Sequence, residues 1–194
     1  MVNFPPLSMT IGWFSAFIDR WIEKGDEQEA IEYANTFLSS SKEFGRMRLK
    51  NVKNESLALS VAIEGGGRAL RSFDNVSEAC LSDHGNWKKN HLGAFEACLG
   101  KKPFFRHLLT GLEKPFTDET CLSLRDFNSA IFNTLKTFLI GNAGIEAVAL
   151  YKKDPIVKAR GRELLKSIDP DISLIQAVAD YGQETLLAVM AFEN

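Results

Sequence analysis

The sequence predicts an α+β protein with a small, mainly antiparallel sheet in its N-terminal half, a central packed helix at about residues 86–99 and a helical C-terminal half. Three observations predict this architecture. Between residues 45 and 63, short alternating or apolar runs are separated by turn residues, as in antiparallel strands. Residues 86–99 place apolar side chains at helical spacing. Beyond residue 105, start signals for helices recur along the chain.

The composition is that of one ordinary globular unit. The 194 residues are 45% hydrophobic and 25% charged, which suits a chain that buries a sizeable core. We expect residues 1–115 to form the α+β core and residues 116–194 to form a helical part of the same compact domain. The formal net charge of −2 gives no general attraction to nucleic acid, so no nucleic-acid partner is expected. The oligomeric state stays open.

Cysteine usage predicts a reducing compartment, and hydropathy predicts that no segment spans a membrane. The cysteines are scattered and form no CxxC pair, at Cys80, Cys98 and Cys121, which argues against a disulfide framework and a zinc site. The histidines also lack metal-ligand spacing, so neither a metal nor a cofactor is expected. Because the sequence shows no secretory signal pattern and no 18-residue apolar run, we expect no membrane span and a cytoplasmic location.

The first helix is expected at about residues 10–24, because apolar residues recur there at three- and four-residue spacing. These residues are Ile11, Phe14, Ile18, Trp21 and Ile22. Strands of the sheet are then expected near residues 30–37, 45–49, 56–63 and 70–76. The short, turn-like links between these segments favour antiparallel pairing over crossover connections.

Arg46 and Arg48 alternate with apolar residues in the second of these strands, so both guanidinium groups are expected on one face. Two arginines side by side repel each other unless an anion lies between them. That anion is either a carboxylate of the protein itself or the carboxylate or phosphate of a substrate. The sequence leaves both alternatives open.

The triple glycine at residues 65–67 predicts a turn or a β-bulge. It lacks GxGxxG spacing, a following GK[ST] motif and a strong helix start, so it is not interpreted as a phosphate-binding loop.

An imidazole lies on the apolar face of the central helix. Asn86 is a suitable N-cap, and a period of 3.6 residues places Trp87, His91 and Phe95 on one side, with Cys98. His91 and Cys98 are about 10 Å apart along the axis, too far for a Cys–His nucleophile pair. His91 is therefore either a hydrogen-bonded core residue or a functional group whose partners come from another segment.

The C-terminal half is expected to consist of helices that pack and carry no catalytic groups. Thr117 as a cap, followed by the acidic residues Asp118 and Glu119, predicts a helix start. Asp154-Pro155 predicts another helix, which reaches about Lys166. Gly182 is expected to separate the last two short helices.

Several of these segments together resemble the WbqC-like protein family, whose members occur among bacterial O-antigen and polysaccharide biosynthesis genes. The resemblance is that of a divergent member. It runs from about Phe4 to about Ala143. The strongest part is Asn86-Trp87-Lys88-Lys89-Asn90-His91 followed by Pro103-Phe104-Phe105. Pro5-Pro6, Arg46-Met47-Arg48-Leu49 and Leu57-Ala58-Leu59-Ser60-Val61 before Glu64-Gly65-Gly66 are also similar to the family pattern.

The resemblance implies a transferase that attaches a glycine-type acyl or aminoacyl group to a nucleotide- or lipid-linked sugar. In that hypothesis His91 is the general base and Asn86 donates a hydrogen bond. The substrate would be held by basic and aromatic side chains, namely Arg46, Arg48, Trp87, Lys88, Lys89, Phe104 and Phe105. The alternative is a non-catalytic binding or assembly protein of a polysaccharide locus.

Overall fold

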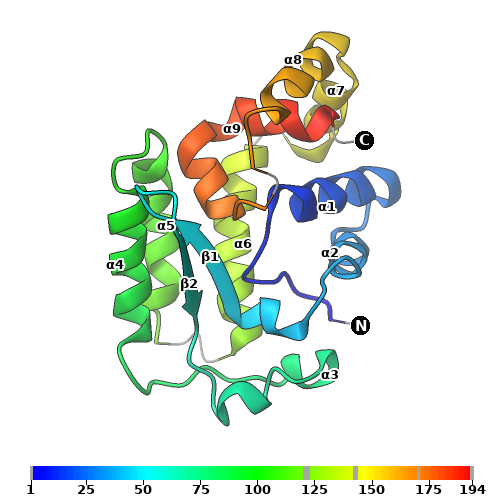
Figure 1. The fold of residues 1–194 in the computed structure, drawn as a ribbon. Helices are drawn as coiled ribbons and strands as arrows, with labels where there is room; N and C mark the ends of the chain where they lie inside the picture. The colour runs from blue at the N-terminus through cyan, green and yellow to red at the C-terminus, as the bar shows by residue number, and fades with distance from the viewer. Residues whose placement is uncertain (1, 120–122, 142–143, 170, 193–194) are drawn as a thin grey trace.

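The computed structural model describes residues 2–119, 123–141, 144–169 and 171–192, and most of these residues are helical (Figure 1). The first elements are α1 (Ile11–Lys24), α2 (Glu27–Asn35), the 3₁₀ helix η1 (Ser41–Gly45), β1 (Arg46–Lys50) and β2 (Ser56–Ser60). The middle of the chain forms η2 (Gly66–Arg68), α3 (Phe73–Val76), α4 (Trp87–Leu99) and α5 (Phe105–Thr117). The rest forms α6 (Leu124–Ile140), α7 (Gly144–Lys153), α8 (Pro155–Leu165) and α9 (Leu174–Phe192).

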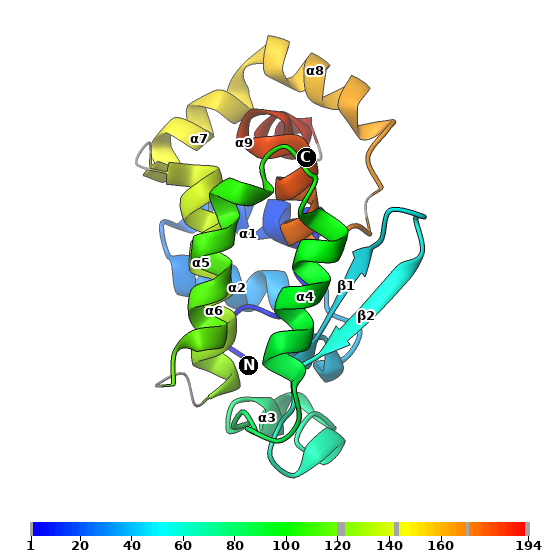
Figure 2. The same ribbon diagram turned by 90° about the vertical axis from the view of Figure 1, so that its left-hand side faces the viewer.

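The predicted α+β architecture is confirmed, with an antiparallel sheet in the N-terminal half and a helical C-terminal half. The sheet consists of β1 and β2, in a register that pairs Arg46 with Ser60 and Arg48 with Ala58. Helices α4 and α5 lie side by side, and α4 runs alongside β2 (Figure 2). The central helix and the strands predicted near residues 45–49 and 56–63 are therefore present.

The strand predicted near residues 30–37 is wrong, because this segment belongs to α2. Asp26 caps the helix, since its carboxylate accepts hydrogen bonds from the backbone N–H of Gln28 at 2.8 Å and of Glu29 at 3.1 Å. Acidic residues in the first turn favour the helix further. Ala30, Ile31 and Ala34 are buried at helical spacing, a pattern that a short apolar run does not distinguish from a strand.

The strand predicted near residues 70–76 is also wrong, and the one predicted at 56–63 is shorter than expected. Ser72 caps the short helix α3, with its hydroxyl accepting from the backbone N–H of Asn75. β2 ends at Ser60, and Ile63 makes an isolated antiparallel bridge to Leu81 instead. The glycines before and within η2 turn the chain there, as predicted for residues 65–67.

The first predicted helix is confirmed as α1, which Thr10 caps. Its apolar face joins the core, where Phe17 packs edge-on against Phe132 of α6 with ring centroids 5.1 Å apart. In the helical half, Asp154 caps α8 and Pro155 is its first residue, as predicted. Gly182 interrupts α9 with non-helical backbone angles, so the expected separation there is confirmed.

The helix start predicted at residues 117–119 is wrong. Helix α5 continues to Thr117, and α6 begins at Leu124. The hydroxyl of Ser123 caps α6, accepting from the backbone N–H of Asp126 at 3.0 Å. Cys121, named above, lies outside the described residues, whereas Cys80 and Cys98 are free thiols.

Two buried asparagines hold residues 2–10 across the core. The Asn35 amide donates to the carbonyl oxygens of Val2 and Phe4, both at 2.9 Å, while its oxygen accepts from the Trp13 indole at 3.2 Å. The Asn128 amide of α6 donates to the carbonyl oxygens of Pro5 at 3.1 Å and Phe44 at 2.8 Å. The segment is therefore an internal strap and not a surface extension.

The beginning of α9 is tied to the free edge of β1. The Gln176 amide oxygen accepts from the backbone N–H of Lys50 at 2.7 Å, and its nitrogen donates to the Lys50 carbonyl at 3.4 Å. Asp169 forms an ion pair with the Lys50 ammonium, and this hydrogen bond lowers the pKa of the Asp169 carboxyl. Ser173 also forms a β-bridge with Thr10. These contacts bring residues 8–10, β1 and residues 169–176 together.

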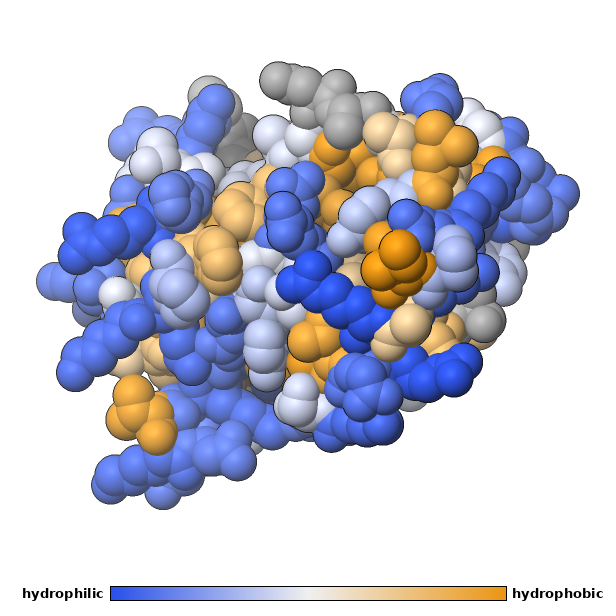
Figure 3. All heavy atoms as spheres, turned by 90° about the horizontal axis from the view of Figure 1, so that it is seen from above, coloured by the Kyte–Doolittle hydropathy of each residue, from blue (hydrophilic) through white to orange (hydrophobic). Residues whose placement is uncertain are grey.

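The face that carries α7 and α8 is a mosaic of small apolar areas separated by polar side chains (Figure 3). Leu150 and Ile156 are exposed apolar side chains of these two helices. Among the described residues, no helix combines the length and the apolar character that a membrane crossing requires.

Replacing Asn35 by alanine is expected to lower the free energy of unfolding by about 2–4 kcal/mol, because it leaves an indole N–H and two carbonyl groups without their partner in the core. Urea denaturation measures this loss. Asn90→Ala is the matched control, since Asn90 is exposed on α4 and its removal should change stability by less than about 0.5 kcal/mol. Equal effects of the two variants would contradict the role of the internal strap.

Candidate functional site

The start of α4 carries the residues with the strongest sequence signal. Asn86 occupies the N-cap position, as predicted, but its side chain makes no capping hydrogen bond. Trp87 is buried, and its indole N–H donates to the Ser82 carbonyl at 2.8 Å. This bond fixes the loop before α4 against the helix.

His91 lies one turn further on and is closed in by aromatic rings. Its side chain is 1% exposed, with ring centroids 5.5 Å from those of both Trp87 and Phe116. Nδ1 lies 2.7 Å from the Trp87 carbonyl oxygen, which can only accept, so Nδ1 carries the hydrogen. Nε2 is buried and has no hydrogen-bond partner. Burial lowers the pKa of the imidazole, so the neutral ring is favoured.

The structure does not open His91 onto the space that the arginines line. Two pockets contain Arg46, and neither includes His91. A general base has to reach the proton that it removes within hydrogen-bonding distance. The catalytic role of His91 and Asn86 therefore stays a prediction, and it requires Trp87 or Phe116 to move so that Nε2 becomes accessible.

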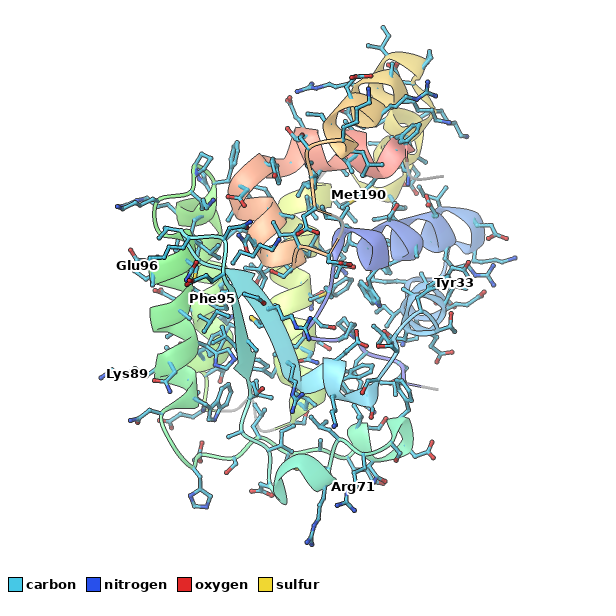
Figure 4. All side chains as sticks on the ribbon, in the orientation of Figure 1. Tyr33, Arg71, Lys89, Phe95, Glu96 and Met190 are labelled. Atoms are coloured by element: carbon cyan, nitrogen blue, oxygen red, sulfur yellow. The ribbon has the colours of Figure 1, made fainter. Side chains whose placement is uncertain are left out.

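The two lysines beside Trp87 differ in their contacts. The Lys88 ammonium lies 3.6 Å from an Asp83 carboxylate oxygen and 5.9 Å from the centre of the Trp87 ring. Lys89 projects outward from α4 on the same outer side as Glu96, whereas Phe95 faces inward (Figure 4). Neither lysine lines the pockets that contain Arg46.

Phe104 and Phe105 lie beyond the other end of α4, so the structure does not bring them to Trp87. Phe105 is buried in the core. The Phe104 ring covers Gly182, where an added Cβ would lie 2.7 Å from its Cζ atom. The Phe104 backbone N–H also donates to the Ala179 carbonyl at 3.1 Å. Both rings thus contribute to packing around α5 and α9.

Arg46 and Arg48 share the exposed face of β1, which confirms their predicted orientation. Both line a hollow of about 490 Å³, here called the anion pocket. Residues from four separate segments form it, namely Ser8, Thr10, Ser39, Ser40, Lys42, Glu43, Arg46, Met47, Arg48, Asp171 and Ser173. Within the described ranges, no carboxylate forms an ion pair with either arginine, so the alternative of a protein carboxylate between them is not found.

A second hollow, of about 820 Å³, lies on the other side of Arg46 and is called the glycine-loop pocket. Its lining comprises residues 45–46, 60–67, 70 and 82–84. The Ser82 N–H donates to the Ala62 carbonyl at 2.9 Å and so brings the loop before α4 onto the segment after β2. His84, Asp83 and Glu64 are the ionisable side chains that join Arg46 there.

Sequence reasoning missed this second group. His84 stands two residues before Asn86, but no periodic pattern connects it with Arg46 or Glu64. Backbone pairing of residues 62–64 with residues 80–82 brings the loop that carries His84 next to Glu64, and this pairing is a long-range contact. In the part of the chain that the structure describes, no three His, Cys, Asp or Glu side chains come together as metal ligands.

Comparison with known proteins gives one family. Residues 28–179 match the WbqC-like protein family, and this match covers well over half of the chain. The matched range includes β1, β2, both loops of the glycine-loop pocket and α4. No curated protein and no solved structure matches the chain significantly.

The closed position of His91 predicts a pH-dependent stability. The unfolded chain binds a proton at its imidazole with a pKa near 6.5, and the folded chain does so only at lower pH. As the pH falls below about 6.5, the unfolded state gains protons first, so the free energy of unfolding decreases. The expected result is that wild type loses stability relative to His91→Phe between pH 7.5 and pH 5.5.

Urea denaturation of both proteins at several pH values measures this difference. His107→Gln is the control for removing an imidazole, because His107 is exposed on α5. Its stability should follow that of wild type throughout. If the difference in free energy of unfolding between wild type and His91→Phe stays constant with pH, the His91 ring is not held neutral.

Proposed function

We propose that this chain, which belongs to the WbqC-like protein family, transfers an acyl or aminoacyl group, such as glycine, to a sugar in O-antigen or surface-polysaccharide biosynthesis. The acceptor is a nucleotide- or lipid-linked sugar, and the reaction takes place in the cytoplasm. Free thiols at Cys80 and Cys98 are consistent with a reducing compartment.

The observation that carries this proposal is the position of Arg46 between two polar hollows. The anion pocket offers two guanidinium groups that form no ion pair with any described carboxylate, and the glycine-loop pocket offers an imidazole and carboxylates. A group transfer needs two substrates held with their reacting atoms close together. Two adjoining pockets that share one arginine meet this requirement, with the anionic part of one substrate next to the acid–base groups.

His84 is the accessible imidazole of this arrangement, since it is exposed and lines the glycine-loop pocket. In the proposed step, the acceptor hydroxyl or amine loses its proton to the imidazole as its oxygen or nitrogen attacks the donor's carbonyl carbon. The leaving group departs with the electron pair of the broken bond and takes the proton back from the imidazole. His91 would serve the same step only after its aromatic cover opens.

A second candidate function is supported by the closed surroundings of His91. If this ring is a core residue, the histidine of the strongest motif serves packing, and if His84 is not a base either, the chain binds its sugar ligand without transforming it. This alternative corresponds to a non-catalytic binding or assembly protein of a polysaccharide locus. The presence or absence of turnover separates the two candidates.

The test is a transfer assay with isotopically labelled glycine supplied as an activated thioester and a panel of nucleotide-linked sugars as acceptors. Mass spectrometry detects the glycylated sugar. His84→Gln is expected to reduce the rate at least 100-fold, in line with the usual contribution of a general base. Its free energy of unfolding should change by less than about 0.5 kcal/mol, because the side chain is exposed.

His107→Gln serves as the matched control and should keep the wild-type rate. A rate that falls only in His91→Phe, in a protein that still folds, would assign the base to His91 instead. Sugar binding without any product in wild type would support the non-catalytic alternative.

A further inference from the structure

Among the described residues, no ion-pair partner of Arg46 or Arg48 is found, either within the sheet or beyond it. The register places Ser60 opposite Arg46 and Ala58 opposite Arg48, so the cross-strand neighbours are small and uncharged. The opposite face of β1 carries Met47 and Leu49, which are buried. Two like charges next to each other on a strand are unfavourable unless an anion compensates them. The free protein therefore keeps an electrostatic cost that a bound anion would remove.

The anion pocket surrounds these guanidinium groups with further donors. Lys42 adds a third cation, and the hydroxyl groups of Thr10, Ser40 and Ser173 accept backbone N–H groups, which leaves their hydrogens for a ligand. Of the two carboxylates in the lining, Glu43 is already engaged: it accepts from the Ser39 N–H and hydroxyl, from the Ser40 N–H and from the Ser8 hydroxyl. Asp171 is the other carboxylate. The balance of charges and donors favours an anion with several oxygens.

An aromatic hollow of about 350 Å³ continues from the anion pocket and shares Ser8, Thr10 and Glu43 with it. Its remaining lining is Gly12, Trp13, Ala16, Phe37 and Leu38. The Phe37 ring is 62% exposed and meets Tyr33 edge-on, with centroids 5.3 Å apart. A flat ligand ring can stack on such an exposed aromatic face. Hydroxyl and carboxylate groups at the shared boundary can hydrogen-bond the edge of that ring.

We propose that these two adjoining hollows bind a nucleoside diphosphate, with the phosphates on Arg46 and Arg48 and the base against Phe37. Residues two apart on a strand are about 6.8 Å apart along the backbone, close enough for two long arginine side chains to converge on one diphosphate group. The apolar part is short and has a polar boundary, which suits a base better than a long lipid chain. The inference rests on the proposed function in one respect, because it makes the substrate a nucleotide-linked sugar.

Isothermal titration calorimetry tests the site with uridine, guanosine, cytidine and adenosine diphosphates, each titrated separately, and with inorganic pyrophosphate as the phosphate-only probe. At least one nucleoside diphosphate is expected to bind ten or more times as tightly as pyrophosphate. Arg48→Gln should weaken both ligands at least tenfold. Phe37→Ala should bring the affinity for the nucleotide close to that for pyrophosphate and leave pyrophosphate binding unchanged.

Arg71→Gln is the matched control, since Arg71 is an exposed arginine in the loop before α3, outside both hollows (Figure 4). It should bind as wild type does. The proposal is overturned if no nucleoside diphosphate binds, if Arg48→Gln leaves the affinity unchanged, or if geranyl diphosphate binds more tightly than every nucleotide. The last result would assign the apolar hollow to a lipid.

The binding experiment contains no acyl donor, so its outcome is independent of turnover. Nucleotide binding without glycine transfer would support the proposed nucleotide site and contradict the proposed transferase function. Transfer to a sugar that carries no nucleotide, without nucleotide binding, would keep the transferase and refute this site.

Discussion

The amide of Gln176 is the contact on which the candidate site depends. A two-stranded sheet has little stability of its own and needs support from neighbouring elements. Gln176 bonds to both polar backbone groups of Lys50, so the free edge of β1 is paired at that residue by a side chain of α9. With Met47 and Leu49 buried beneath, the strand cannot rotate, and its arginines have to face outward. The burial of Met47 and Leu49 sets the outward orientation of the two arginines, and Gln176 of a distant segment holds the edge of the strand in place.

Local signals in the sequence were sufficient for elements with clear ends. Helix α1 has an apolar stripe and a capping threonine, and α8 begins with Asp154-Pro155, so both were predicted correctly. The strand predicted at residues 30–37 is wrong because a short apolar run fits a strand and a helix equally well. The capping carboxylate of Asp26 and the acidic residues of the first turn stabilise the helix instead. The capping residue thus distinguishes a helix from a strand where the apolar run does not.

The site could be predicted only in part, for a different reason. Alternation along β1 correctly placed Arg46 and Arg48 on one face, because that is a property of the strand alone. The helical period likewise placed His91 with Trp87 and Phe95, and the burial of that face followed. The sequence could not show that Phe116 of α5 would cover the imidazole, or that His84 would line a hollow with Arg46. Such relations depend on tertiary contacts between distant segments, which no local pattern encodes.

The internal strap also has a consequence for how the protein is made. Residues 2–10 leave the ribosome well before Asn128 and Leu174, which bond to Pro5 and Met9. Asn35 and Phe44 are available early and contact Phe4. The apolar segment nevertheless cannot complete its contacts until residues 128 and 174 have been synthesised. Packing of the core around this strap is therefore completed only after residue 174 has left the ribosome, late in the synthesis of these residues.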